Sequence, residues 1–162
     1  MTATRIDDFI TALVAAARAA QATTLANVTV QDGPWPARYI VTDADFLIIG
    51  GDFDPQNVDV SAVTSVQTPS PMGNNSVDED LTVIGVAVSQ SGDPGAMTTC
   101  RAKAVATTEA FEDLLTADPK LGGLLQSPAV LSVTSLRQVQ TDGGPYCAVN
   151  FTVNASALIW NG

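Results

Sequence analysis

The chain of 162 residues contains no histidine. This absence excludes Ser-His-Asp and Cys-His catalysis, zinc sites with histidine ligands, and histidine proton shuttles. A Gly-x-Ser-x-Gly nucleophile motif, a Walker loop and a dinucleotide-binding fingerprint are missing as well. Carboxylates are therefore the one class of side chain left for acid–base catalysis or for binding a catalytic metal.

Basic residues and cysteines are few. Seven Lys and Arg against 17 Asp and Glu give a formal net charge of −10. This balance argues against a protein that grips nucleic-acid phosphates, because such binding needs a Lys/Arg surface. It permits a surface that repels DNA sliding past it, although keeping the chain in solution is the simpler explanation. Cys100 and Cys147 fall at apolar positions, so we expect small buried hydrophobic residues.

Long hydrophobic runs are absent too, since no stretch approaches the roughly 20 apolar residues that a membrane span needs. Apolar residues nevertheless make up 46% of the chain and charged residues only 15%, which excludes a disordered tail. A chain of this length fits one domain, which would bury about 70% of its unfolded surface.

The most informative pattern runs from residue 147 to residue 159. The odd-numbered residues are apolar, and the even-numbered ones are small or polar as far as Ser156. A period of two predicts a long strand with one face on a core, about 40 Å long and about twice the usual length. A compact enzyme rarely needs such a strand, whereas a protein that builds a wall, a ring or a tube does.

Two stretches have the spacing of helices. Residues 4–21 carry an apolar stripe, with Thr4 as the expected N-cap and Asp7 three residues later. Asp93-Pro94 predicts the start of a second helix that ends near Ala117. Basic residues lie early in this helix and acidic residues late, the reverse of what its dipole favours. These charges either contact something outside the helix or form a solvated face.

Strands are expected in the remaining apolar segments, and residues 120–126 are a candidate short helix. The expected strands cover residues 27–31, 38–41, 45–49, 58–66, 81–90, 130–140 and 147–159. Because residues 46–49 are all apolar, that strand should be covered on both faces. The element order predicts one α+β domain over residues 1–162, with a mixed, mainly antiparallel sheet, two main helices and a long C-terminal β-hairpin.

Residues 68–80 lack any periodicity and hold two prolines, a glycine, two asparagines and three consecutive acidic residues. Such a segment inside a compact domain predicts a long flexible loop with a functional role. Asp78, Glu79 and Asp80 at its end are expected at a solvated loop tip, or on the acidic face of a channel or partner contact.

The connection at residues 141–145 decides which side chains of the last two strands share a face. Because the returning strand is apolar at odd positions, a loop of three or five residues would pair odd with odd. We therefore predict an odd-length loop, which puts Leu131, Val133 and Val139 on the face of Val149. Arg137 would then lie on this apolar side, either extending past the core edge or meeting an acidic group on a partner.

Leu158, Trp160, Arg137 and Trp35 are the candidate contacts with another molecule. Leu158 and Trp160 are apolar residues on the otherwise polar side of the last strand. Trp160 either folds back onto the core or is buried against a partner. Trp35 lies between two prolines, which hold it in an extended conformation.

An aspartate cluster supplies the one alternative with chemistry. It comprises Asp43, Asp45, Asp52, Asp54, Asn57 and Asp59. Asp52, Asp54 and Asp59 with Asn57 could supply oxygen ligands for Ca²⁺ or Mg²⁺, but the spacing lacks the glycine and the final glutamate of an EF-hand loop. Aspartate is also common in turns for its own backbone contacts. No catalytic residue, metal ligand or cofactor is therefore assigned.

The order, size and texture of these segments resemble phage tail terminators, the tail-completion proteins of long non-contractile tails. The resemblance rests on the opening helix IDDFITALVAAARAA, the segment DFLIIGGDFD, the strand DLTVIGVAVSQ, the helix TTCRAKAVATTEAFEDLL and the closing hairpin VLSVTSLRQVQTDGGPYCAVNFTVNASALIW. It covers nearly the whole chain but includes no invariant motif, so no functional residue is carried over.

The resemblance implies a non-enzymatic virion protein at the head–tail junction, assembled in the host cytoplasm as a ring, with a hexamer as the expected size. The ring would cap the tail-tube protein, end tube polymerisation and meet the head-side connector or head-closure protein. DNA would pass through its lumen without specific binding, and no membrane would be involved. Two alternatives are another head–tail interface or tail-tube subunit and, more remotely, a carboxylate enzyme that uses a divalent metal.

Overall fold

The computed structural model describes residues 3–34, 43–53, 61–71 and 75–160. In chain order its elements are α1 (Ile6–Ala20), β1 (Val28–Asp32), β2 (Ala44–Ile49), β3 (Val63–Pro69), β4 (Ser76–Gln90), α2 (Met97–Ala117), β5 (Val130–Thr141) and β6 (Gly144–Trp160). The strands form a mixed, mainly antiparallel sheet that ends in the β5–β6 hairpin, so the predicted α+β fold is confirmed.

Strands β4 and β6 form the centre of the sheet. They pair in antiparallel fashion along the whole of β4, from Ser76 opposite Trp160 to Gln90 opposite Tyr146. The other edge of β4 pairs with β3 over its first half and with β2 over its second half. β3, residues 76–83 of β4 and residues 153–160 of β6 therefore form a three-stranded extension, which we call the arm.

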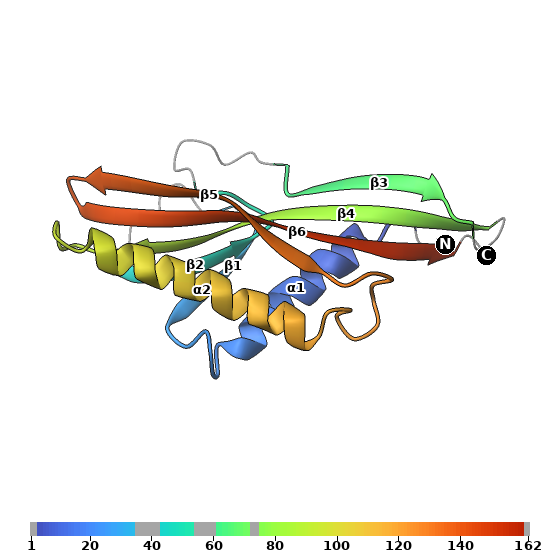
Figure 1. Ribbon diagram of the computed structural model, residues 1–162, viewed down its shortest axis with the longest axis horizontal. Helices are drawn as coiled ribbons and strands as arrows, with labels where there is room; N and C mark the ends of the chain where they lie inside the picture. Colours follow the sequence, from blue (N-terminus) through green and yellow to red (C-terminus); the bar gives the residue numbers. More distant parts are fainter. Residues whose placement is uncertain (1–2, 35–42, 54–60, 72–74, 161–162) are drawn as a thin grey trace.

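The molecule is elongated along these strands (Figure 1). Both helices lie on one side of the sheet, with the tip of the β5–β6 hairpin at one end of the long axis and the arm at the other. The beginning and the end of the described chain both lie near the arm. The two ends of the sheet are thus far apart in space, although both belong to the β4–β6 pair.

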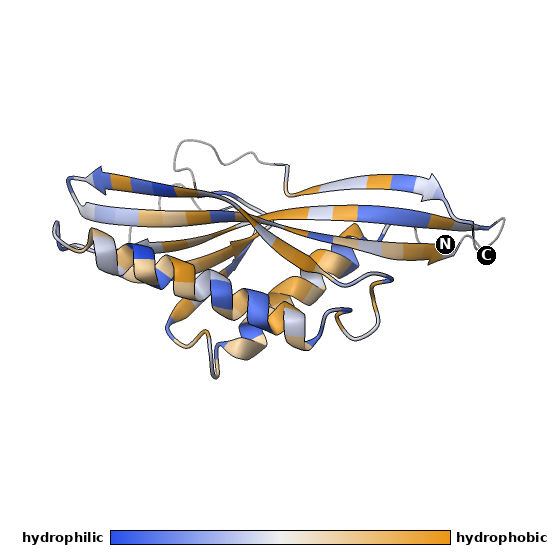
Figure 2. Ribbon diagram, in the orientation of Figure 1, coloured by the Kyte–Doolittle hydropathy of each residue, from blue (hydrophilic) through white to orange (hydrophobic). Residues whose placement is uncertain are grey.

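Two apolar clusters lie on opposite faces of the sheet. The larger lies under the helices, where Phe9 and Leu13 of α1 and Phe111 of α2 pack on odd-numbered residues of the central strands, such as Phe151. The smaller lies on the opposite face, which we call the outer face, and contains Phe46, Ile48, Phe53, Val86, Val88 and Ala148. Figure 2 shows the corresponding alternation of apolar and polar residues along the long strands. Strand β2 is covered on both sides, as predicted.

The predicted loop at residues 68–80 is wrong at both ends. Thr68 and Pro69 belong to β3, and residues 76–80 belong to β4. The acidic run does not break the strand, because alternation places Glu79 on the helix side and Asp78 and Asp80 on the outer face. The connection shrinks to residues 70–75, of which 72–74 lie outside the described residues.

The helix boundaries also differ from the prediction. α1 begins at Ile6, and the Thr4 hydroxyl accepts a hydrogen bond from the Ile6 amide at 3.2 Å. α2 begins at Met97, because the Asp93 carboxylate accepts the Gly95 amide at 2.9 Å and closes a turn before the helix. Residues 120–126 form turns instead of a short helix, since residues 121–123 all have positive φ angles.

The predicted odd-length hairpin loop is wrong as well. Thr141 pairs with Gly144, so the connection has two residues, and a β-bulge between Val133 and Ser135 restores the odd–odd pairing further along. Leu131 and Val133 therefore lie on the predicted face. Val139 and Arg137 do not, because they pair with Tyr146 and Ala148 and share the outer face with them.

Gly85 allows the closest packing between the two central strands. A Cβ atom at this position would lie 2.5 Å from the Phe151 ring and 2.9 Å from the Ile48 carbonyl oxygen. We predict that Gly85→Ala lowers the free energy of unfolding by about 1–3 kcal/mol through overpacking, measured by chemical denaturation. Gly92→Ala is the matched control, because a Cβ atom at position 92 would meet nothing within 4 Å; equal losses in both variants would contradict the prediction.

Candidate functional site

Several of the sequence-predicted site residues lie outside the part of the chain that the structure describes. Trp35 is among them, as are Asp54, Asn57 and Asp59 of the proposed metal cluster. In the described residues, no group of three or more Cys, Asp or Glu side chains is placed to hold a metal ion. Neither α1 nor α2 is long and apolar enough to cross a membrane.

Glu79, predicted at an exposed loop tip or channel wall, is fully buried. Its side chain lies between β3, β4 and the start of α1. Four donors reach it: the Thr4 hydroxyl at 2.6 Å, the Arg5 backbone amide at 2.7 Å, the Ser65 hydroxyl at 2.6 Å and the Gln67 amide at 3.2 Å. This carboxylate therefore ties the N-terminus of α1 to the arm. It accepts the Arg5 amide just before the helix, where the sequence predicted Thr4 as the N-cap.

The charge of Glu79 is stabilised without an ion pair among the described residues, since Arg5 pairs with Asp8 instead. Burial alone would raise the pKa of the Glu79 carboxyl. The four hydrogen bonds, led by that from Ser65, outweigh burial and hold the pKa below its ordinary value near 4.5. Glu79 is thus a buried structural anion that positions the arm.

The outer face of the arm carries both acidic and apolar side chains, which we call the acidic arm face. It comprises Val66, Asp78, Asp80, Leu158 and Trp160. Trp160 is 58% exposed and Val66 60%, so neither folds back onto the core. Asp78 has one buried carboxylate oxygen that accepts no hydrogen bond within the described chain. The strands of the arm contain no Lys or Arg, so these acids have no basic neighbour there.

A second surface follows the free edge of β5, which pairs only with β6 among the described strands. We call it the basic edge, and it comprises Arg101 and Val105 of α2 with Val133, Leu136 and Arg137 of β5. The bulge places Val133 and Leu136 on the helix side, yet they are 59% and 45% exposed. The Arg101 guanidinium donates to Gln138 at 2.8 Å, which brings the first half of α2 against β5.

Arg137 is the only charged residue of β5. It is exposed, and no acidic side chain of the described chain forms an ion pair with it. Because Arg137 lies on the outer face, its predicted place on the apolar, helix-covered side is wrong, and so is the prediction that it extends past the edge of that core. The remaining explanation from the sequence, a contact with an acidic group on a partner, stays a prediction.

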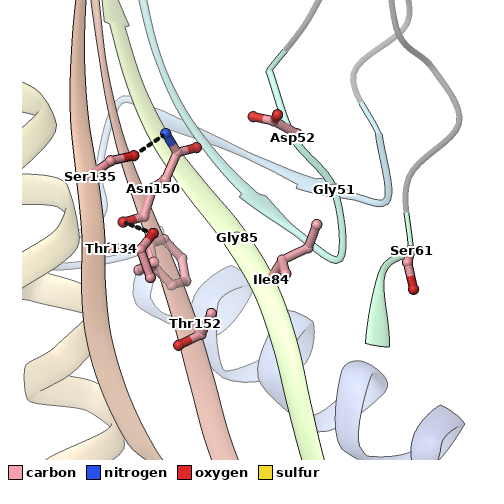
Figure 3. Close-up of a pocket in the computed structure, with 10 residues that line it drawn as sticks. Gly51, Asp52, Ser61, Ile84, Gly85, Thr134, Ser135, Asn150 and Thr152 are labelled. Atoms are coloured by element: carbon pink, nitrogen blue, oxygen red, sulfur yellow. Dashed lines mark hydrogen bonds between the residues drawn. The ribbon is translucent and has the colours of Figure 1, made fainter. Parts of the chain in front are cut away.

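A shallow cavity of about 520 Å³ lies on the outer face between the bulge and the end of β2 (Figure 3). Asn150 dominates one wall: its side chain donates to the Ser135 hydroxyl at 3.0 Å, and its backbone carbonyl accepts the Thr134 hydroxyl at 3.1 Å. The carboxylate of Asp52 accepts the neighbouring Phe53 amide at 2.7 Å. The polar groups of this cavity thus support the bulge and a turn, and the lining pairs no nucleophile with a base.

A smaller cavity of about 240 Å³ lies between β2 and the start of α2. The Asp45 carboxylate accepts the Ser89 hydroxyl at 2.6 Å and lies 4.0 Å from the Lys103 ammonium group. Arg101 and Lys103 therefore contact strands of the sheet, which accounts for their early position on the helix. Cys100 and Cys147 are buried nearby, as predicted, and burial raises the pKa of the Cys147 thiol.

Sequence reasoning missed Val66, Val105, Val133 and Leu136 as surface residues. Their apolar character favoured a core position, and single strands give no signal for which edge stays unpaired. For Val133 and Leu136 the obstacle was the bulge at Thr134, which changes the register inside one strand.

The hydrogen bonds of Glu79 yield a pH-dependent prediction. Glu79→Gln removes the charge and places an NH₂ group against hydrogen-bond donors. We therefore expect the free energy of unfolding to fall by about 1–3 kcal/mol at pH 7. The folded-state pKa is depressed, so the contribution of Glu79 is complete above the ordinary pKa near 4.5 and is lost as pH falls below it. The free energies of unfolding of the parent chain and of Glu79→Gln, measured by denaturation, should therefore converge in acid.

Asp113→Asn is the control for this comparison, because it removes an exposed carboxylate from α2. It should change stability little at either pH. A Glu79→Gln variant as stable as the parent at pH 7, or a gap that widens in acid, would contradict the structural role.

A comparison with models of known protein families, and with sequences of characterised proteins, found no match to this chain. The likeness to tail terminators therefore rests on the order and texture of the segments.

Proposed function

We propose that this chain is a virion structural protein that forms a ring at the head–tail junction of a long-tailed phage. In this role it caps the tail tube, ends tube polymerisation and joins the tail to the head-side connector. The observation that carries the proposal is the pair of exposed apolar surfaces at the two ends of one elongated sheet. A monomeric protein rarely leaves such surfaces at strand edges.

The architecture supports assembly over catalysis. The longest strands serve to connect the two ends, and the polar groups lining both cavities described above bond to the surrounding strands and turns. Glu79, whose carboxylate accepts four hydrogen bonds, is buried where no substrate reaches it. These features fit a subunit whose surface carries the function.

The charge of the chain supports a channel role. A net charge of −10 per copy, repeated around a ring, surrounds a lumen with negative potential. DNA would pass through such a lumen without being held, because its phosphates are repelled. Only a closed ring encloses such a lumen, so the state of assembly is the first property to measure.

We predict that light scattering over a range of protein and Mg²⁺ concentrations finds one closed species beyond the monomer. Six copies of a 16.7-kDa chain would give about 100 kDa. A mass that stays at one value as the concentration rises supports the terminator role, because ring closure buries the contact surfaces of every subunit. Open-ended polymers would favour a tail-tube subunit, and a monomer under all conditions would contradict the ring.

A further inference from the structure

We propose that the basic edge of one copy binds the acidic arm face of the next copy, head to tail. This inference rests on the proposed function, because it assigns the contact from which the ring is built. It goes beyond that function in naming the two surfaces and their partner, a second copy of the same chain. Charge, apolar area and geometry each support the contact.

The charges of the two surfaces are complementary. The strand at the basic edge carries Arg137 as its single charge, and this guanidinium has no acidic partner in the described chain. The arm carries Asp78 and Asp80 on its outer face, with no basic residue in any of its strands. In a chain with ten excess negative charges, like surfaces repel, so a contact that pairs opposite charges is favoured.

Each surface also exposes apolar side chains beside its charges. Val105, Val133 and Leu136 are the exposed apolar residues of the basic edge, with Val133 and Leu136 on the helix side of β5 and Arg137 on its outer face. On the arm, the exposed Val66 and Trp160 share the outer face with the acids. Large aromatic and Arg side chains are the residues that most often dominate the energy of protein contacts. Trp160 and Arg137 supply one of each, on opposite members of the proposed pair.

The placement of the two surfaces makes the contact head to tail. Arg137 lies near the hairpin tip, and the arm lies at the other end of the long axis (Figure 1). One copy therefore cannot satisfy its own pair of surfaces. Two copies related by a two-fold axis would bring like surfaces together, whereas a heterologous contact leaves one free surface of each kind and closes only as a ring.

The test reverses the charge of one exposed residue on each of the two surfaces. Arg137→Glu and Asp80→Lys each place like charges against each other, so each variant alone should need an about tenfold or higher concentration to assemble. The matched controls are Lys120→Glu and Asp113→Lys, which change the net charge equally at exposed positions that belong to neither surface. They should assemble like the parent chain.

Mixing the two variants provides the decisive measurement. In a head-to-tail ring, Glu at position 137 of one copy meets Lys at position 80 of the other, and the second contact keeps its original Arg137 and Asp80. An equimolar mixture should therefore form alternating rings at the concentration where neither variant does, as seen by native mass spectrometry. The recovery also shows that both variants are folded.

The outcomes separate this contact from the proposed function. If the parent chain forms rings but both reversals leave assembly unchanged, or the mixture fails to recover, the contact is wrong and the ring stands. If the parent chain stays monomeric at every protein and Mg²⁺ concentration, the ring itself is contradicted and the contact with it. Recovery in the mixture alone, with intact controls, supports both.

Discussion

The antiparallel pairing of β4 with β6 is the constraint on which the rest of the structure depends. It runs the full length of β4 and fixes which side of every other element faces the core. In β4 and β6, odd positions face the helices and even positions form the outer face. Because side chains alternate strictly, a shift of one residue would exchange the two faces. Gly85 marks the register, since only a residue without a Cβ fits against Phe151 there.

Glu79 extends this constraint to the arm. A buried carboxylate is costly unless donors surround it, and here they come from β3 and from the residues just before α1. The cost is offset only when all these parts are in place, so the anion couples the position of the arm to the helix layer. The acidic arm face is thereby presented on a fixed support rather than on a loop.

Sequence patterns were sufficient for the elements whose environment is local. Strand β6 and the apolar strand β2 follow directly from alternation and from a solid apolar run, and the α+β class follows from the order of the elements.

The sequence-based predictions failed where tertiary contacts determine the local structure. The run Asp78-Glu79-Asp80 resembles a loop by composition, yet strand pairing and the donors around Glu79 keep it extended. The two-residue turn at 142–143 was missed because the compensating bulge at Thr134 has no sequence signal. Leu158 and Trp160 were singled out by their place in the alternation, while their acidic neighbours on the arm became visible only through the pairing of β4 with β6.

The fold and the surfaces together describe a subunit whose long sheet carries unlike surfaces at its two ends. Single-particle electron microscopy of the assembled protein would show this arrangement directly. We expect closed rings of one size, in which the β5 edge of each copy lies against the arm of its neighbour. Filaments without an end, or rings joined through like surfaces, would contradict it.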